Sequence, residues 1–205
     1  MKRHIITISR EFGSGGRELA RRLAEGLGIA YYDREIVTAV AEKSGLAVEY
    51  IDSISERSVG SRYPITFGHT LAYQPPVMDP QLEVLSQQRQ ILLSLAEKGD
   101  CVIVGRCADV ILREYNPLNI FVYADKASKL ARCRARAPQD EHLSDNELAR
   151  RIARVDKERA RYRATITETK WGERAAYHLC VNTTGWEIPQ LVKCLLPYAN
   201  AFLER

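Results

Sequence analysis

Short apolar segments alternate along this chain with segments of helical periodicity, and this alternation restricts the possible folds more than any other feature. The first apolar run is HIITIS (residues 4–9); a glycine-rich turn follows it, and apolar residues then recur at helical spacing until Gly28. CVIVGR (101–106) begins with a continuous apolar run, and IFVYA (120–124) is another. Because continuous apolar strands need cover on both faces, the pattern predicts an α/β fold with a doubly wound parallel sheet of about five strands.

The remaining segments complete the alternation. We expect strands at IAYYD (29–33) and YHLCVNTT (177–184), and helices at 34–45, 81–98 and 189–204. Two Arg-rich helical segments lie between IFVYA and the last strand. The carboxyl ends of parallel strands form the ligand-binding edge of such a sheet, so residues that follow strands are the first candidates for a site.

The length of the chain sets its domain organisation. The 205 residues, of which 45% are hydrophobic, are enough for one substantial core, so we expect residues 1–205 to form a single domain. That domain would include an irregular insert at 53–80 and a helical, Arg-rich lid region at 136–170. No stretch approaches the roughly 20 apolar residues of a membrane span, and the five cysteines contain no C-x-x-C pair. We therefore expect a cytoplasmic protein without membrane contact, whose thiols are reduced and mostly buried.

The turn after the first strand has the glycine content of a phosphate-binding loop. In a loop of the form GxxxxGK[ST], backbone amides hold phosphate and the lysine adds a positive charge. We align residues 13–15 with the second half of that motif. Arg10 then stands at its first glycine, Gly16 at its lysine and Arg17 at its metal-binding serine or threonine.

Phosphate binding does not depend on the lysine alone. Glycines let the backbone approach an anion closely, and the free amides at the following helix start attract it. We therefore predict phosphate binding here, with Arg10 or Arg17 in place of the missing ammonium. The alternative is a glycine-rich turn that merely joins a strand to a helix. The predicted phosphate- and nucleotide-binding residues are Arg10, Gly13, Ser14, Gly15, Gly16, Arg17 and Glu18.

Two other predicted strands end in charged residues. Arg106 follows the apolar run at 101–104, so it would emerge at the carboxyl edge of the sheet and face the ligand crevice. Asp33 ends the second strand, where a carboxylate suits Mg²⁺ or a sugar hydroxyl, and Arg34 follows it. We assign Asp33, Arg34 and Arg106 to binding of a second ligand, with a solvated arginine at 106 and a helix cap at 33 as the alternatives.

The segment RRIARVDKERARYR (150–163) carries seven basic residues against two acidic ones. Arg151, Arg154 and Arg159 fall roughly on one helical face, and Asp156 can orient Arg159 from three residues away. We interpret the segment as a lid that closes on phosphates. A solvated basic helix and a nucleic-acid face are the alternatives; nucleic acid is not expected, because the net charge is only +4 and aromatic residues that would stack bases are sparse.

These sites together resemble a known family. The segments SREFGSGGRELARRLAEGLG, YYDREIV, VIVGRCADVIL and VNTT are similar to the bacterial cytidylate kinase-like family, a branch of the P-loop nucleoside monophosphate kinases. The resemblance implies a P-loop kinase-like domain that transfers a phosphoryl group from ATP or GTP, with Mg²⁺, to a nucleoside monophosphate or other small acceptor. In cytidylate kinases a Gly-Arg arginine and a D-x-x-R pair hold the monophosphate and the transferring phosphoryl group. They match Arg106, Asp156 and Arg159 here, and D-G-R-D becomes Val104-Gly105-Arg106-Cys107.

Two functions follow from these residues. The first is a phosphotransferase with Arg17, Arg106, Asp156 and Arg159 as catalytic residues, Arg106 also on the acceptor, and Arg151, Arg154 and Arg159 as lid cations. The second is a non-catalytic nucleotide-sensing protein that has lost the lysine of its phosphate-binding loop. The retained D-x-x-R pair favours the first, because transition-state charge needs cations. A small-molecule nucleotide is the expected partner in both, and the sequence identifies neither metal ligands nor oligomeric state.

Overall fold

The computed structural model describes residues 3–33, 36, 38, 42, 80–138 and 143–205. Within these ranges the strands form one sheet in which all pairs are parallel, in the order β2-β3-β1-β4-β5. This confirms the predicted doubly wound parallel sheet of five strands. The strands are β1 (Ile5–Arg10), β2 (Ala30–Tyr32), β3 (Cys101–Val104), β4 (Leu118–Tyr123) and β5 (Leu179–Asn182).

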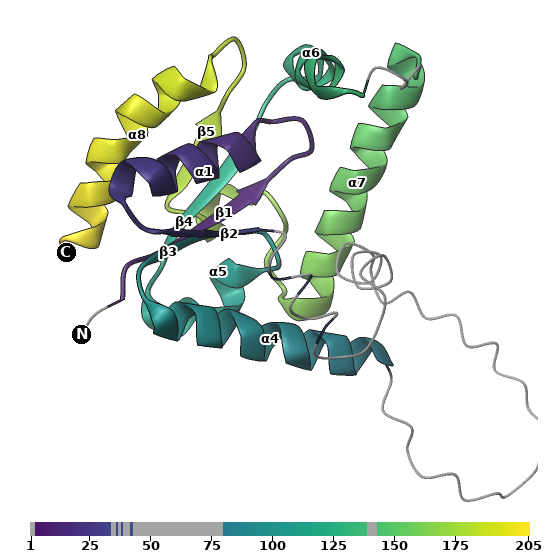
Figure 1. The fold of residues 1–205 in the computed structure, drawn as a ribbon. Coiled ribbons are helices and arrows are strands. Elements are labelled where there is room, and N and C mark those ends of the chain that lie inside the picture. The colour runs from purple at the N-terminus through teal and green to yellow at the C-terminus, as the bar shows by residue number, and fades with distance from the viewer. Residues whose placement is uncertain (1–2, 34–35, 37, 39–41, 43–79, 139–142) are drawn as a thin grey trace, which may run out of the picture.

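Helices cover both faces of the sheet (Figure 1). Helices α1 (Gly16–Leu27) and α8 (Ile188–Leu203) pack on one face, over a core that includes Ile6 and Ile8. Helices α4 (Pro80–Lys98) and α5 (Ala108–Ile111) pack on the other, over a core that includes Ile5 and Ile103. Adjacent residues of β1 therefore face opposite cores, which explains why Ile5, Ile6 and Ile8 are all buried.

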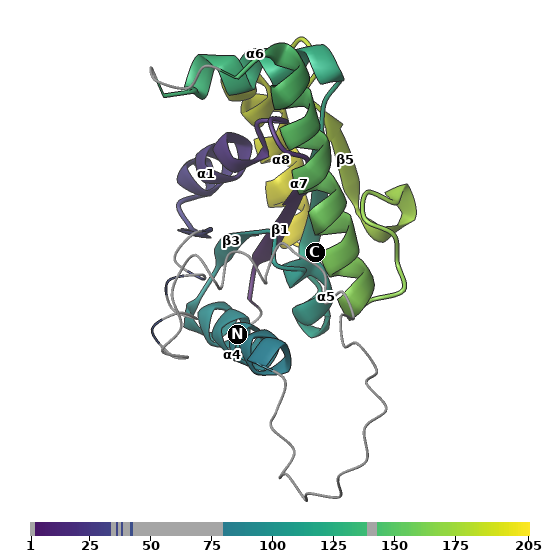
Figure 2. The ribbon, with the colours of Figure 1, turned by 90° about the vertical axis from the view of Figure 1, so that its right-hand side faces the viewer.

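Two further helices lie near the carboxyl ends of the central strands (Figures 1 and 2). They are α6 (Lys126–Arg136) and α7 (Asp145–Ile166), and short 3₁₀ turns occupy Arg113–Tyr115 and Arg174–Ala176. Helix α7 begins with a capping box: the Glu147 amide donates to Ser144 Oγ at 3.3 Å, and the Ser144 amide donates to Glu147 Oε2 at 2.8 Å. The start of this helix is thus specified by its own sequence.

The other end of α7 is anchored in the protein interior. Arg163 Nη1 lies 2.7 Å from Asp109 Oδ2 of α5, and both side chains are only 3% exposed. The same guanidinium donates to Thr169 Oγ1 at 2.8 Å and lies over the ring of Tyr177. Gln88 Nε2 of α4 also donates a hydrogen bond to the Tyr162 hydroxyl. The last turn of α7 is therefore fixed to the helices that cover the sheet.

Expectations for the helix at 34–45 and for the insert are described only in part by the structure, and the expectation for the cysteines is wrong. Of the helix expected at 34–45, the described residues Ile36, Thr38 and Glu42 are helical; Arg34 and residues 53–79 of the expected insert lie outside the described residues. The cysteines are free thiols, but the expectation that most are buried is wrong: Cys101 and Cys107 are buried, and the other three are not. No helix in the described ranges is both long and apolar enough to cross a bilayer.

Candidate functional site

The turn between β1 and α1, residues 11–15, is called the glycine loop below. Gly13 and Gly15 have φ values of 76° and 81°, in the left-handed region that disfavours other residues. Their surroundings exclude a side chain as well. A Cβ on Gly13 would lie 2.9 Å from Cys133 Sγ, and a Cβ on Gly15 would lie 2.6 Å from the side chain of Ile188. The glycines therefore permit both the turn and its close packing under α6 and α8.

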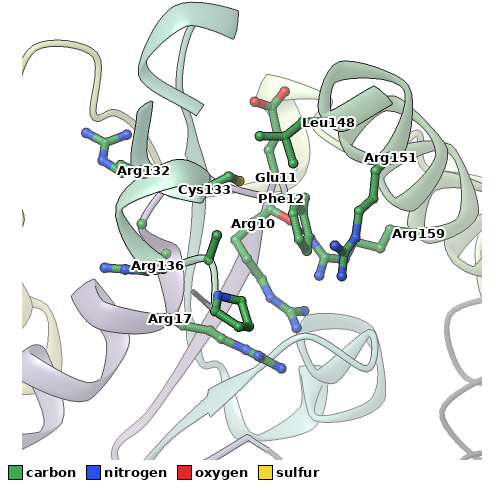
Figure 3. Close-up of a pocket in the computed structure, with 15 residues that line it drawn as sticks. Arg10, Glu11, Phe12, Arg17, Arg132, Cys133, Arg136, Leu148, Arg151 and Arg159 are labelled. Atoms are coloured by element: carbon green, nitrogen blue, oxygen red, sulfur yellow. The ribbon is translucent and has the colours of Figure 1, made fainter. Parts of the chain in front are cut away.

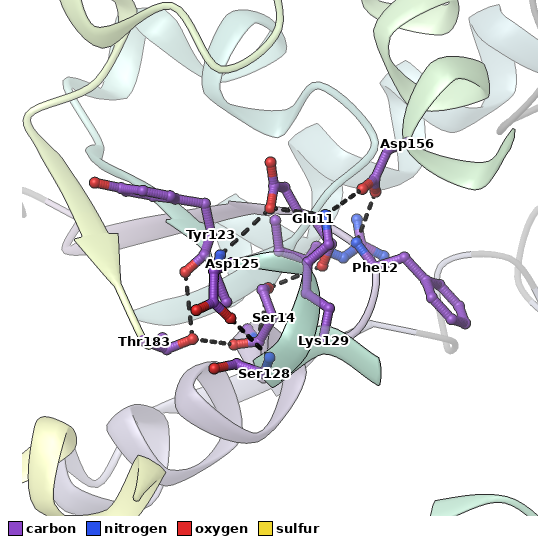
Figure 4. Close-up of polar contacts among 12 residues, drawn as sticks. Glu11, Phe12, Ser14, Tyr123, Asp125, Ser128, Lys129, Asp156 and Thr183 are labelled. Carbon is purple, nitrogen blue, oxygen red and sulfur yellow. Dashed lines mark hydrogen bonds and ion pairs between the residues drawn. The ribbon is translucent and has the colours of Figure 1, made fainter. Parts of the chain in front are cut away.

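Hydrogen bonds from Ser14 hold the glycine loop in shape (Figure 4). Ser14 is fully buried, and its hydroxyl donates to the Glu11 carbonyl at 2.8 Å. Its carbonyl accepts from Thr183 Oγ1, at the end of β5, at 2.7 Å. Among the described residues, no backbone carbonyl accepts a hydrogen bond from the amides of Gly13, Gly15 and Arg17. Those amides stand at a helix start and are the available anion donors.

A cavity of about 500 Å³ lies beside the glycine loop (Figure 3). Its described lining includes one carboxylate, Glu11, and six arginines. Figure 3 shows guanidinium groups from β1, α1 and α7 pointing toward one space, whereas those from α6 point away from it; the shared space is suited to an anion. The arginines are Arg10, Arg17, Arg132, Arg136, Arg151 and Arg159.

Asp33 contacts the arginines that flank the glycine loop. Its Oδ2 lies 2.7 Å from Arg17 Nε, and its Oδ1 lies 3.9 Å from Arg10 Nη2. The glutamates nearby have other partners: Glu11 pairs with Lys129 at 3.0 Å, and Glu18 pairs with Arg22 of α1. A cation at the start of a helix opposes the helix dipole, and the carboxylate of Asp33 offsets this cost at Arg17.

Lys129 of α6 joins the glycine loop to α7 (Figure 4). Its ammonium lies 3.0 Å from both Glu11 Oε2 and Asp156 Oδ2. Asp156 also accepts from the Phe12 amide at 2.6 Å, which fixes the loop against α7. Burial alone would lower the pKa of Lys129, but the two carboxylates hold that pKa above its ordinary value. Burial raises the pKa of Asp156, and the Phe12 amide and Lys129 oppose that rise.

Arg159 completes the contact between α7 and the first strand. Its Nη1 donates to the Arg10 carbonyl at 3.1 Å and lies 3.7 Å from Asp156 Oδ1, so the i,i+3 pair expected from the sequence is present. The guanidinium also lies over the Phe12 ring. Asp156 and Arg159 thus meet the glycine loop from α7.

Arg106 lies on the turn after β3, in strained backbone. Gly105, Arg106 and Cys107 have consecutive positive φ values of 74°, 58° and 50°, and for a residue other than glycine this conformation costs about 1 kcal/mol or more. The Arg106 carbonyl accepts from Gln88 Nε2 at 3.3 Å. Arg106 lines a smaller cavity of about 30 Å³ together with Arg10 and Arg159, which also line the larger cavity.

Other predicted residues lie apart from this group. Arg154 is exposed on α7 and does not line the larger cavity. Arg163, counted within the basic segment, is buried against Asp109. Sequence reasoning also missed the basic residues of α6. Arg132 donates to Thr183 Oγ1 at 3.0 Å and thereby ties α6 to the turn after β5. The signal available was a helix with five basic residues, KASKLARCRAR, directly after a buried strand.

Comparisons with known proteins agree with this arrangement. A family model described as the cytidylate kinase-like family matches residues 5–185. A cytidylate kinase from Methanopyrus kandleri is 25% identical over 211 residues, covering 98% of this chain and 95% of that protein. An uncharacterized protein from Eubacterium ventriosum has a similar structure, with a TM-score of 0.68, 25% identity and coverage of 96% and 98%. A shikimate kinase from Bacteroides thetaiotaomicron, 16% identical with a TM-score of 0.58 and coverage of 96% and 98%, shares the fold.

Proposed function

The chain belongs to the cytidylate kinase-like family, and from that premise we propose that it is a nucleotide-binding phosphotransferase. It would transfer a phosphoryl group from ATP or GTP to a nucleoside monophosphate or another small acceptor. The observation that carries the proposal is the arginine-lined cavity over the glycine loop. Phosphoryl transfer depends on positioning and on neutralising charge, and this cavity would supply both.

The donor phosphates would bind at the glycine loop. The amides of Gly13, Gly15 and Arg17 supply hydrogen-bond donors at the start of α1. Arg132 and Arg136 of α6 also line this cavity, but their guanidinium groups bond Thr183 and Glu18, so they would reach the donor only after leaving these partners. Asp33 would act through Arg17, holding that guanidinium beside the loop.

The phosphate of the acceptor would bind beside Arg106, at the smaller cavity, which would have to widen from about 30 Å³ to admit the acceptor. Arg10 and Arg159 line both cavities, so they lie between the proposed donor and acceptor positions. Charge in a phosphoryl transfer develops between those two positions. Arg159, held by Asp156, would then stabilise the transferring group, and Arg106 would bind the phosphate of the acceptor.

Residues 136–170 would form a lid hinged at the anchored end of α7. Arg151 and Arg159 reach the larger cavity from α7, whereas Arg163 fixes the far end of the helix to α5. The contacts of Asp156 and Arg159 with Phe12 of the glycine loop would be those of a closed lid.

Mg²⁺ would accompany the nucleotide rather than occupy a protein site. Within the described residues, no three His, Cys, Asp or Glu side chains gather as metal ligands would. The nearby carboxylates of Glu11, Asp33 and Asp156 each pair with lysine or arginine, and Arg17 stands where a metal-binding hydroxyl is usual. These residues do not fit a protein-held Mg²⁺. Nucleotide phosphates usually supply much of its coordination in kinases.

Binding and transfer assays test this function against nucleotide sensing. Calorimetry with ATP and GTP, with and without Mg²⁺, measures binding; transfer from γ-labelled ATP is then measured with each nucleoside monophosphate and with small hydroxylated acceptors. We expect both binding and transfer, and at least tenfold weaker ATP binding for Arg151→Ala. Arg154→Ala, an exposed arginine on the same helix, is the matched control. Tight nucleotide binding without transfer to any acceptor would favour the sensor.

A further inference from the structure

We propose that Arg10 supplies the positive charge that lysine supplies in a GxxxxGK loop, and that Gly16 and Gly105 are glycines because the Arg10 side chain occupies the space beside them. This inference rests on the proposed function, since it assigns the cation of the same donor site. The Arg10 side chain leaves the end of β1 and crosses the carboxyl edge of the sheet.

The first part of that path runs past Gly16. A Cβ on Gly16 would lie 2.6 Å from Arg10 Cβ, 3.2 Å from Arg10 Cγ and 3.3 Å from Val122 Cβ. Protein Cβ atoms essentially never lie within 3.0 Å of another heavy atom, and Arg10 Cβ is fixed to the backbone of β1. Position 16 is the lysine position of the motif. This structure therefore cannot hold a lysine at 16 and an arginine at 10 together.

The guanidinium ends beside Gly105, on the turn after β3. A Cβ on Gly105 would lie 1.9 Å from Arg10 Nη1, so a side chain there would displace the guanidinium. The positive φ of Gly105 favours glycine for a second reason. Between these two glycines, Arg10 crosses from the start of α1 to the smaller cavity beside Arg106.

Arg10 fits the role better than Arg17, although both contact Asp33. The side chain of Arg10 is 8% exposed and that of Arg17 is 48% exposed. Arg10 lines both cavities, whereas Arg17 lines the larger one. A guanidinium remains charged when buried, and its effect on a neighbouring phosphate is stronger where water is excluded.

The charge is needed at the bond that breaks. When the acceptor is a monophosphate, one of its oxygens forms the new bond to the γ-phosphorus of the donor. The bond from that phosphorus to the bridging oxygen breaks, and its electron pair stays on the nucleoside diphosphate as negative charge; no proton has to move. A guanidinium between donor and acceptor stabilises this charge as it develops.

A reciprocal swap tests the proposal. Arg10→Gly combined with Gly16→Lys turns residues 10–16 from REFGSGG into GEFGSGK, which is a GxxxxGK loop. The full chain is compared as wild type, Arg10→Ala, Gly16→Lys, the double variant and the control Arg154→Ala. Thermal unfolding, calorimetric binding of inorganic tripolyphosphate and of ATP, and kcat and KM for transfer from ATP to CMP are measured for each.

We expect Arg10→Ala to lower kcat by about 100-fold or more and to weaken tripolyphosphate binding about tenfold, while Arg154→Ala stays near wild type. Gly16→Lys alone should unfold at a lower temperature than wild type, and the double variant should regain both stability and tripolyphosphate binding. If wild type binds nucleotide and Arg10→Ala binds and transfers within twofold of it, or if the double variant is no more stable than Gly16→Lys, the inference is wrong and the proposed function stands. If wild type binds neither ATP nor tripolyphosphate, both fail.

Discussion

Replacing Asp109 with alanine should destabilise the protein severely, because the change leaves the Arg163 guanidinium buried without its carboxylate. The two side chains are 3% exposed and meet at 2.7 Å. Burial would lower the pKa of Arg163, and Asp109 is the main group that raises it above its ordinary value. Thr169 and the Tyr177 ring remain as neutral contacts and do not replace the lost charge.

The magnitude follows from the burial of the pair. Removing one partner of a buried ion pair costs about 3–5 kcal/mol in the free energy of unfolding. For a chain of this size, each kcal/mol lowers Tm by about 2–4 °C, so the expected fall is about 6–20 °C. Urea and thermal unfolding measure the two quantities, and hydrogen exchange should rise first in the last turn of α7.

An exposed ion pair between α6 and the start of α7 is the matched control. Asp145 Oδ1 lies 2.8 Å from Arg134 Nη2, but the arginine is 39% exposed and the aspartate 76%. Asp145→Ala should therefore cost no more than about 1 kcal/mol. The double variant Asp109→Leu with Arg163→Met should recover most of the loss, because no buried charge remains. If Asp109→Ala costs as little as Asp145→Ala, burial does not govern this pair and the anchored end of α7 is not explained.

Three further predictions concern other parts of the molecule. Gly13→Ala should abolish tripolyphosphate binding, because the added Cβ would lie 2.9 Å from Cys133 Sγ. Gly28 also has a positive φ, but a Cβ there would meet no atom within 4 Å, so Gly28→Ala should cost only about 1 kcal/mol of stability. Equal effects of the two variants on tripolyphosphate binding would contradict this prediction. Lys129→Met should cost about 1–3 kcal/mol at pH 8, where it leaves Glu11 and Asp156 without their shared ammonium. The cost should be smaller at pH 5, because burial raises the pKa of Asp156 and this carboxyl gains a proton as the pH falls. Urea unfolding at the two pH values measures the difference, and an unchanged cost would refute it. Burial and then Arg205 lower the pKa of His178, whose Nδ1 accepts from the Asn119 amide at 3.0 Å. The contribution of His178 to stability is therefore complete above the ordinary histidine pKa and is lost as the pH falls through the lowered pKa. His178→Gln should flatten the decline in Tm between pH 7 and 5, and an unaltered decline would exclude His178 as its source.

The fold was predictable from the sequence because its signals are local. Each strand is a short apolar run, and each helix shows its period within about a dozen residues, so the order of elements indicated a parallel sheet. The residues that follow the strands were predictable for the same reason: Arg106 follows β3 and Asp33 follows β2, as their positions in the sequence indicated.

The partners of the charged residues were not predictable in this way. Asp33 faces Arg17, and Lys129 bridges Glu11 and Asp156, across separations that periodicity cannot report. Whether a basic residue lines a cavity or is buried depends on which way its helix faces. Arg151 and Arg163 belong to one basic segment, yet one lines the larger cavity and the other is fixed to Asp109.

The contact between Gly16 and Arg10 also limits how the sequence of such a loop can change during evolution. A single exchange that places lysine at 16 meets the Arg10 side chain, and a single exchange that removes Arg10 leaves neither side chain beside the loop. The route from one arrangement to the other therefore passes through an intermediate that is either strained or lacks the cation, so the two mutations are strongly epistatic. Lineages with the lysine arrangement and lineages with the arginine arrangement would each tend to keep it while the rest of the sequence diverges. A search of genomes that requires lysine in this loop would pass over every descendant of the arginine arrangement, whereas a pattern with arginine at the end of the first strand and glycine six residues later would recover them.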